Sequence, residues 1–68
     1  MIIHLREEYI KLGQALKLAN LVEQGSDAKV VIQDGEVEVN GEVELRRGRK
    51  LYPGDVVDFD GEQILILQ

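Results

Sequence analysis

The sequence predicts an α+β fold, in which a short N-terminal strand and a two-helix hairpin pack on a small, mainly antiparallel sheet. Apolar residues recur at three- and four-residue intervals from Leu12, which is typical of a helix. Residues 36–45 alternate between polar and apolar around Asn40-Gly41, and residues 51–67 hold further short apolar runs between glycine turns. Because the chain has 68 residues without a linker, repeat or low-complexity segment, we expect a single domain over residues 1–68.

The first third of the chain is predicted to hold a strand and a helix. Residues 1–6 are mostly aliphatic and are expected to form a short strand. The helix is expected to begin at Leu12 and to stop at Gly25, because glycine readily adopts the left-handed conformation of a helix end. Its apolar stripe would be formed by Leu12, Ala15, Leu16, Ala19 and Val22, broadened by Leu18 and Leu21.

A second, shorter helix is expected from Asp27 to residue 33 or 34. Ser26 would be its N-cap, and Asp27 in the first turn would interact favourably with the helix dipole. Gly35 would end it, so that the two helices form a compact hairpin around a Gly-Ser turn. The side chains facing inward would be Ala28, Val31 and Ile32.

The remainder of the chain is predicted to be sheet. Residues 36–39 and 42–45 would pair across Asn40-Gly41, since both central positions of this tight turn need a positive φ. Their apolar residues would face inward, and Glu36, Glu38, Glu42 and Glu44 would form one polar face. Residues 55–59 and 63–67 would be two more strands, following a Pro53-Gly54 turn and flanking Asp60-Gly61.

Charge is distributed unevenly along the chain. Eight basic and thirteen acidic residues give a net charge of −5. Residues 46–50, Arg-Arg-Gly-Arg-Lys, carry four positive charges and no acid, whereas the other 63 residues carry four basic and thirteen acidic groups, a net of −9. This basic segment is therefore expected to be either a solvated loop that balances the acids or a patch that binds an anionic partner.

The composition also disfavours several classes of protein. There is no Cys, one Ser (Ser26) and one His (His4), which leaves little for nucleophilic catalysis and too few ligands for a zinc site. We therefore expect no enzyme, no catalytic residues, no metal and no cofactor. No apolar run approaches the roughly 20 residues of a membrane span, and no leader is evident, so a cytoplasmic protein without membrane contact is expected.

Four motifs occur in the order Leu12-x-x-x-Leu16, Gly25-Ser26-Asp27-Ala28-Lys29, Gly35-x-Val37-x-Val39-Asn40-Gly41 and Pro53-Gly54-Asp55-x-Val57. Together they resemble the RNA-binding domain named after ribosomal protein S-four, also called the αL motif. The similarity is greatest to the stand-alone bacterial members of the YbcJ/YaaA type, which also show the Arg-Arg-Gly-Arg-Lys-Leu run. It extends from about Leu12 to Val57, roughly two thirds of the chain.

The resemblance implies a non-catalytic protein that binds structured RNA, such as ribosomal RNA, through the basic segment and the start of the second helix. Many such domains carry a basic residue where this chain has Gly25, so its helical hairpin is less basic than usual. Phosphate contacts by arginine and lysine supply most of the affinity for RNA, and arginine also stacks on unpaired bases. The RNA-binding residues implied are Lys29, Arg46, Arg47, Arg49 and Lys50.

Two alternatives stay open at the level of sequence. The chain could be an adaptor that docks a protein partner in RNA metabolism through its acidic hairpin. Tyr52, next to the basic segment, could stack on a base or could belong to the core.

Overall fold

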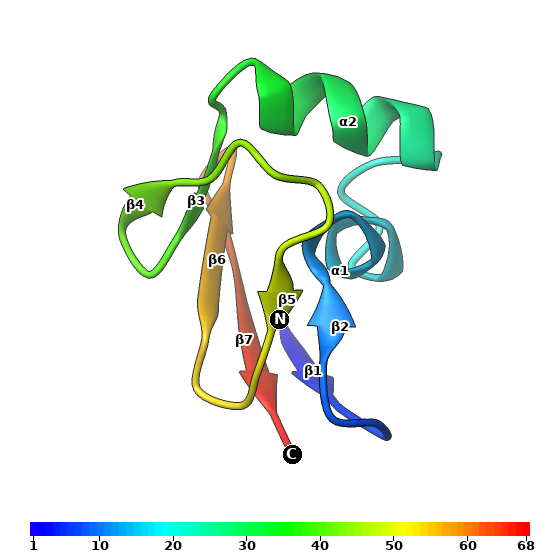
Figure 1. Cartoon of the computed structure of the whole chain (residues 1–68), viewed down its shortest axis with the longest axis vertical. Coiled ribbons are helices and arrows are strands. Elements are labelled where there is room, and N and C mark those ends of the chain that lie inside the picture. Colours follow the sequence, from blue (N-terminus) through cyan, green and yellow to red (C-terminus); the bar gives the residue numbers. More distant parts are fainter.

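A computed structural model describes all residues, 1–68, as two layers in which both helices cover one face of a sheet (Figure 1). The helices are α1 (Leu12–Leu18) and α2 (Gly25–Gln33), and they follow one another directly after the first two strands. The strands are β1 (Ile2–His4), β2 (Ile10–Lys11), β3 (Val37–Val39), β4 (Glu42–Val43), β5 (Lys50–Leu51), β6 (Val56–Phe59) and β7 (Glu62–Leu67). The predicted α+β class is thereby confirmed.

The main sheet has five strands in the order β1-β7-β6-β3-β4. β1 runs parallel to β7, with Ile3 opposite Ile66, and every other neighbouring pair is antiparallel. Two short strands, β2 and β5, form a separate antiparallel pair in which Lys11 lies opposite Lys50. The alternation of the sequence does not indicate this second pair, because each of its strands has only two residues.

The core lies between the helices and the sheet. Buried aliphatic residues of α1 and α2 meet those of the strands, and Ile3 of β1 and Val22 of the inter-helix segment complete the cluster. Large side chains at the centre, each less than 2% exposed, are Leu12, Leu16, Ile32, Val37, Val39, Leu51, Val57, Ile64 and Ile66. The core face of each helix therefore agrees with the predicted apolar stripe, except at Leu18, which is 59% exposed.

The helix ends differ from the predicted ones. α1 stops at Leu18, because Asn20 adopts a positive φ of 63° and turns the chain well before Gly25. α2 begins at Gly25 rather than at Asp27, so Gly25 is no helix stop and Ser26 is no N-cap. The N-cap is Gln24, whose backbone N–H donates to the Asp27 carboxylate at 3.2 Å. The carboxylate at the third helical position thus satisfies the backbone N–H of the N-cap, as in a capping box.

The glycine turns are confirmed. Asn40 and Gly41 have φ angles of 54° and 83°, and Val39 lies opposite Glu42 across this two-residue turn. Asp60 and Gly61 have similar positive φ angles, 51° and 78°, while Gly54 has a φ of 99°, as the third residue of a type II turn after proline requires. The strands end at these turns because the left-handed positions cannot continue a sheet.

The second strand of the first hairpin presents the opposite face from the one predicted. Glu44 is buried, at 6% exposed, whereas Val43 and Leu45 are 56% and 57% exposed. In an antiparallel pair, opposite residues point to the same face of the sheet, so Val43 shares the outer face with its partner Glu38. The expectation of one polar face with four glutamates is therefore wrong for the second strand: Glu42, opposite Val39, and Glu44, beside Val37, both follow the core-facing register, and of the two only Glu44 is buried.

No helix in the structure could cross a bilayer, since α1 and α2 have seven and nine residues.

Candidate functional site

The basic segment is held against the start of α1. The backbone N–H of Leu12 donates to the carbonyl of Arg49 at 2.8 Å, and that of Gly13 donates to the carbonyl of Arg47 at 3.0 Å. The first N–H groups of a helix have no partner within the helix, so the segment satisfies two of them. The segment itself makes a tight turn over residues 46–49, in which the Arg49 N–H donates to the Arg46 carbonyl at 3.2 Å. Figure 1 shows it crossing from β4 to β5.

A single buried carboxylate organises two of its arginines. The Glu44 carboxylate accepts bonds from Nε and Nη2 of Arg46, both at 3.0 Å, and from Nη1 of Arg49 at 2.9 Å. It also accepts the backbone N–H of Arg46 at 3.0 Å. Both ion pairs found in the structure involve Glu44. Charge-assisted bonds of this kind are short and directional, so they fix where the two guanidinium groups lie.

These contacts determine the ionisation of the cluster. Hydrogen bonding from Arg46 lowers the pKa of the Glu44 carboxyl from 4.5 to about 2, with further lowering by Arg49 and against the opposing effect of burial. In return, Glu44 raises the pKa of Arg46 above its ordinary value. The cluster is therefore fully ionised at neutral pH.

A hollow on the surface is lined only by Arg46, Gly48, Arg49 and Lys50. None of these residues is hydrophobic, and three of the four carry a positive charge. The Lys50 ammonium has no carboxylate within salt-bridge distance, and Arg49 offers guanidinium N–H groups that Glu44 does not use. The hollow can thus receive an anionic oxygen group such as a phosphate.

Arg47 lies outside this hollow, on the side that faces α1. Its side chain packs against Gly13, where an added Cβ would come within 2.7 Å of the Arg47 Cγ. It forms no ion pair, and its side chain is exposed. Arg47 therefore adds an unneutralised charge at the border between the basic segment and the first turn of α1.

Two tyrosines flank the other end of the segment. The Lys50 ammonium lies 4.8 Å from the ring centroid of Tyr9, a distance suited to a cation–π interaction. The rings of Tyr9 and Tyr52 are 6.0 Å apart at a tilt of 50°. Tyr52 is 42% exposed, which excludes the interpretation that its ring belongs to the core.

Lys29 stands apart from the other four predicted residues. It is exposed on α2, and no hydrogen bond or ion pair joins it to the basic segment. The structure thus brings Arg46, Arg49 and Lys50 to one hollow, sets Arg47 beside it, and leaves Lys29 on a separate element.

The residue missed at the level of sequence is Glu44. A two-residue turn at Asn40-Gly41 pairs Val39 with Glu42 and sets Glu44 beside Val37, a buried residue. Counting the register outward from that turn would have placed Glu44 on the core side, next to the arginines that follow it.

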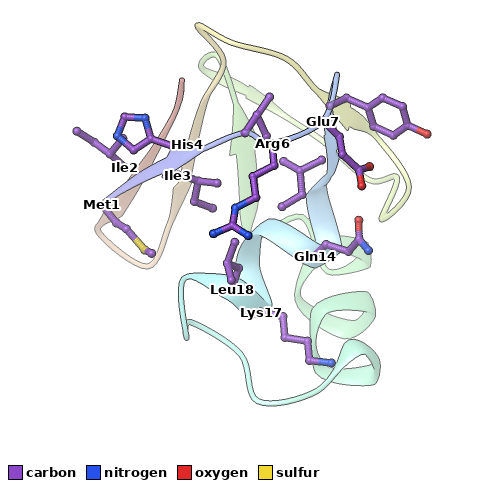
Figure 2. A pocket seen from close by; sticks show the side chains of 12 residues that line it. Met1, Ile2, Ile3, His4, Arg6, Glu7, Gln14, Lys17 and Leu18 are labelled. Carbon is purple, nitrogen blue, oxygen red and sulfur yellow. The ribbon is translucent and has the colours of Figure 1, made fainter. Parts of the chain in front are cut away.

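A second hollow lies between β1 and α1. Figure 2 shows Arg6 reaching across it toward Leu18, with Gln14 and Lys17 along its α1 side. Three of its apolar side chains, Met1, Ile2 and Leu18, are more than half exposed. No group of three or more His, Cys, Asp or Glu side chains gathers here or elsewhere to hold a metal ion.

Comparison with known proteins gives a consistent result. The family model of the S4 domain matches residues 3–67. The chain is 51% identical over 59 residues to the "probable ribosome maturation protein RlbA" of Bacillus subtilis, covering 87% of this chain and 83% of that protein. It is 34% identical over 62 residues to the "putative RNA-binding protein YbcJ" of Escherichia coli, covering 91% and 89% of the two chains.

Solved structures show the same architecture. The solution structure of Escherichia coli YbcJ, described as revealing an αL motif involved in RNA binding, superposes with a TM-score of 0.75 at 32% identity. It covers 98% of this chain and 86% of that one. The 30S ribosomal protein S4e of Thermoplasma acidophilum superposes with a TM-score of 0.69 at 19% identity, over 85% of this chain and 31% of that one, and shows the shared fold.

Proposed function

This chain belongs to the S4 domain family, and from that membership we propose that it is a non-catalytic RNA-binding protein. Its ligand is structured RNA, with ribosomal RNA the first candidate. The RNA backbone is bound by the basic segment, and Lys29 near the start of α2 contributes a further contact. The whole chain, residues 1–68, acts as one RNA-binding domain in the cytoplasm.

The observation that carries this proposal is the cationic hollow of the basic segment. Its lining of Arg46, Gly48, Arg49 and Lys50 offers N–H donors and positive charge and includes no hydrophobic residue. In a chain with a net charge of −5, such a concentration of positive charge gives the protein one face for a polyanion. The acidic surroundings repel phosphates elsewhere, so the footprint is small and directional.

The names of the relatives support the same function. YbcJ is described as an RNA-binding protein and RlbA as a probable ribosome maturation protein, and this chain covers most of both. RNA within an assembling ribosome carries exposed loops and bulges, where arginine can bind phosphate and stack on unpaired bases. We therefore favour a ribosomal RNA over a DNA duplex as the ligand.

The acidic hairpin is the weaker candidate as a docking surface. Glu44 is turned inward and neutralised by two arginines, so only Glu36, Glu38 and Glu42 are exposed there. A protein partner in RNA metabolism remains compatible with RNA binding, and charge reversal at these three glutamates tests for it.

The test uses the two cations of the segment that form no ion pair. Arg47→Ala/Lys50→Ala removes two charges and leaves Glu44 with both of its partners. Arg6→Ala/Lys17→Ala removes the same charge from the hollow between β1 and α1 and is the matched control. Fluorescence anisotropy with labelled hairpin fragments of 16S and 23S ribosomal RNA, titrated at several KCl concentrations, measures binding.

We expect Arg47→Ala/Lys50→Ala to bind RNA more weakly and to lower the log–log salt slope by about 1.4 to 1.8, for two lost phosphate contacts. The control variant should keep the wild-type slope to within about half a unit, since a distant charge releases no counterion. Equal losses in both variants would assign binding to net charge alone. If the wild-type protein binds no RNA even at low salt, the proposed function is wrong.

A further inference from the structure

A buried glutamate, Glu44, lies next to the positive charges of the basic segment. Glu44 precedes Arg46 by two residues, and its carboxylate contacts two of the four cations. By charge alone this position is unfavourable for binding a polyanion, because each negative charge near the site repels phosphate. Glu36, Glu38 and Glu42 on the same hairpin are exposed and form no ion pair, so Glu44 alone is built into the basic segment.

The two arginines are held in different ways. Arg46 gives both Nε and Nη2, which form one edge of its guanidinium, to the two oxygens of Glu44. Arg49 gives only Nη1, so its own Nε–Nη2 edge has no hydrogen-bond partner in the structure. That edge carries two parallel N–H groups, the geometry that binds a phosphate through two hydrogen bonds. The Arg49 side chain is 30% exposed, against 74% for Arg46.

We propose that Glu44 is a positioning residue for RNA binding: it holds the Arg46 side chain in place and orients Arg49 so that the free Nε–Nη2 edge of Arg49 binds an RNA phosphate in the hollow. This inference rests on the function proposed above. Arg46 donates to the Glu44 carboxylate from both its backbone N–H and its guanidinium. These bonds hold the backbone in place at the start of the basic segment. Gly48, where an added Cβ would meet no atom within 4 Å, leaves the approach to the hollow open.

The physical advantage is preorganisation. An unrestrained arginine side chain loses conformational entropy when it binds a phosphate, because several of its rotatable bonds become fixed. That loss of entropy weakens binding. Glu44 restricts Arg49 before RNA arrives, in a site where burial at 6% exposure strengthens the restraining bonds. Its low pKa, about 2, keeps the restraint in place at all pH values at which the protein would meet RNA.

Positioning and simple repulsion predict opposite signs. Glu44→Gln removes one negative charge from the site, so repulsion alone predicts tighter RNA binding. Positioning predicts weaker RNA binding, because the neutral amide of Gln holds the two guanidinium groups less firmly than the carboxylate does. Glu42→Gln is the matched control: the same residue type two positions earlier, exposed and without an ion pair.

The experiment measures the Kd of each variant for the labelled 16S ribosomal RNA hairpins at a fixed low salt concentration, with unfolding curves to verify folding. We expect Glu44→Gln to raise Kd at least about fivefold and Glu42→Gln to leave it unchanged or lower it up to about twofold. In an Arg49→Ala background the Glu44→Gln change should cost no more than about twofold. Tighter or equal binding by Glu44→Gln, or an undiminished loss in that background, overturns the proposal.

Two additions keep the test decisive. Glu44→Asp retains the charge but shortens the side chain by one methylene; if Glu44→Gln does not fold, this variant should still bind several-fold more weakly, and binding equal to wild type overturns the proposal. Nitrogen-15 NMR of the arginine Nε–H groups reports restraint without RNA. Should wild type bind no RNA, the proposed function fails, whereas restraint of Arg46 and Arg49 that is lost in Glu44→Gln would still support the positioning geometry and its absence would overturn it.

Discussion

The side chain of Arg47 packs directly on the backbone of Gly13. A Cβ at position 13 would lie 2.7 Å from the Arg47 Cγ and 3.3 Å from its Cδ, and the Gly13 N–H donates to the Arg47 carbonyl at 3.0 Å. Glycine costs up to roughly 1 kcal/mol relative to alanine in a helix, and Gly13 is the second residue of α1, so this position gives up some helical stability for a close approach. The contact couples the first turn of α1 to the basic segment.

Gly13→Ala should therefore separate stability from binding. The gain in helix propensity and the steric clash oppose each other, so the free energy of unfolding should change by no more than about 1 kcal/mol. Arg47 must leave its present rotamer, which should lower RNA affinity and reduce the log–log salt slope by about 0.7 to 0.9, for one phosphate contact. Urea unfolding and salt titrations measure the two quantities.

Gly25→Ala provides the control for that change, because it also places alanine near the start of a helix and lies outside the hollow. An added Cβ at Gly25 meets no atom within 4 Å. This variant should keep the wild-type salt slope, and a wild-type slope in Gly13→Ala would contradict the assignment of Arg47 to the RNA contact.

Asn40 joins the first hairpin turn to the turn before β6. Its side chain donates from Nδ2 to the Asp55 carboxylate at 3.0 Å and accepts the Val56 N–H through Oδ1 at 2.9 Å. Asn40→Ala loses both bonds and places a residue with a less favourable left-handed conformation at a φ of 54°. We expect a loss of about 2 to 3 kcal/mol in the free energy of unfolding, measured by urea denaturation.

Asn40→Gly divides that loss into its two causes. Glycine tolerates the positive φ but makes neither side-chain bond, so its loss should be smaller than that of alanine by about 1 kcal/mol. Equal stability of wild type and both variants would show that the Asn40–Asp55 link contributes nothing.

The Glu44 cluster predicts a pH dependence of stability. Its pKa is about 2 in the folded protein and near the ordinary 4.5 when unfolded, so the unfolded state takes up the proton first as pH falls. The stabilising contribution is complete above about pH 4.5, is lost as the pH falls toward about 2, and cannot exceed roughly 1.4 kcal/mol per pH unit for one group.

Urea unfolding of wild type and Glu44→Gln between pH 6 and pH 2.5 isolates this contribution, because the other carboxyl groups titrate in both proteins. Wild type should lose stability more steeply than the variant below about pH 4.5. Parallel curves would show that the carboxylate is not held by the arginines in solution.

Local signals account for the parts of the fold that were predicted correctly. Asn40-Gly41, Pro53-Gly54 and Asp60-Gly61 fix their turns because few other residues adopt those φ angles. Helical periodicity likewise identified the core positions of both helices, except that Leu18 is exposed and Val22 is buried outside α1. The end of α1 could not be read in this way, because Asn20 adopts a left-handed φ of 63° that its residue type allows but does not require.

The cations of the basic segment were identified from the sequence, but neither Glu44 nor the arrangement of these cations was. The run at residues 46–50 identifies the cations, yet a count of charges treats them as equal. The structure distinguishes Arg46 and Arg49, which Glu44 restrains, from Arg47 and Lys50, which form no ion pair. That distinction depends on strand register and on the pairing of β2 with β5, both of which join residues distant in sequence.

The position of β7 in the main sheet constrains the order in which the chain can fold during its synthesis. β7, the last strand, lies between β1 and β6 in the main sheet, so β1 has no partner until residues 62–67 have been synthesised. During synthesis on the ribosome, the helices and the first hairpin can form from neighbouring residues, whereas β1 stays unpaired and its aliphatic side chains stay exposed to solvent. Closure of the sheet is thus a late, long-range step, and topologies of this kind fold more slowly than those built from local contacts.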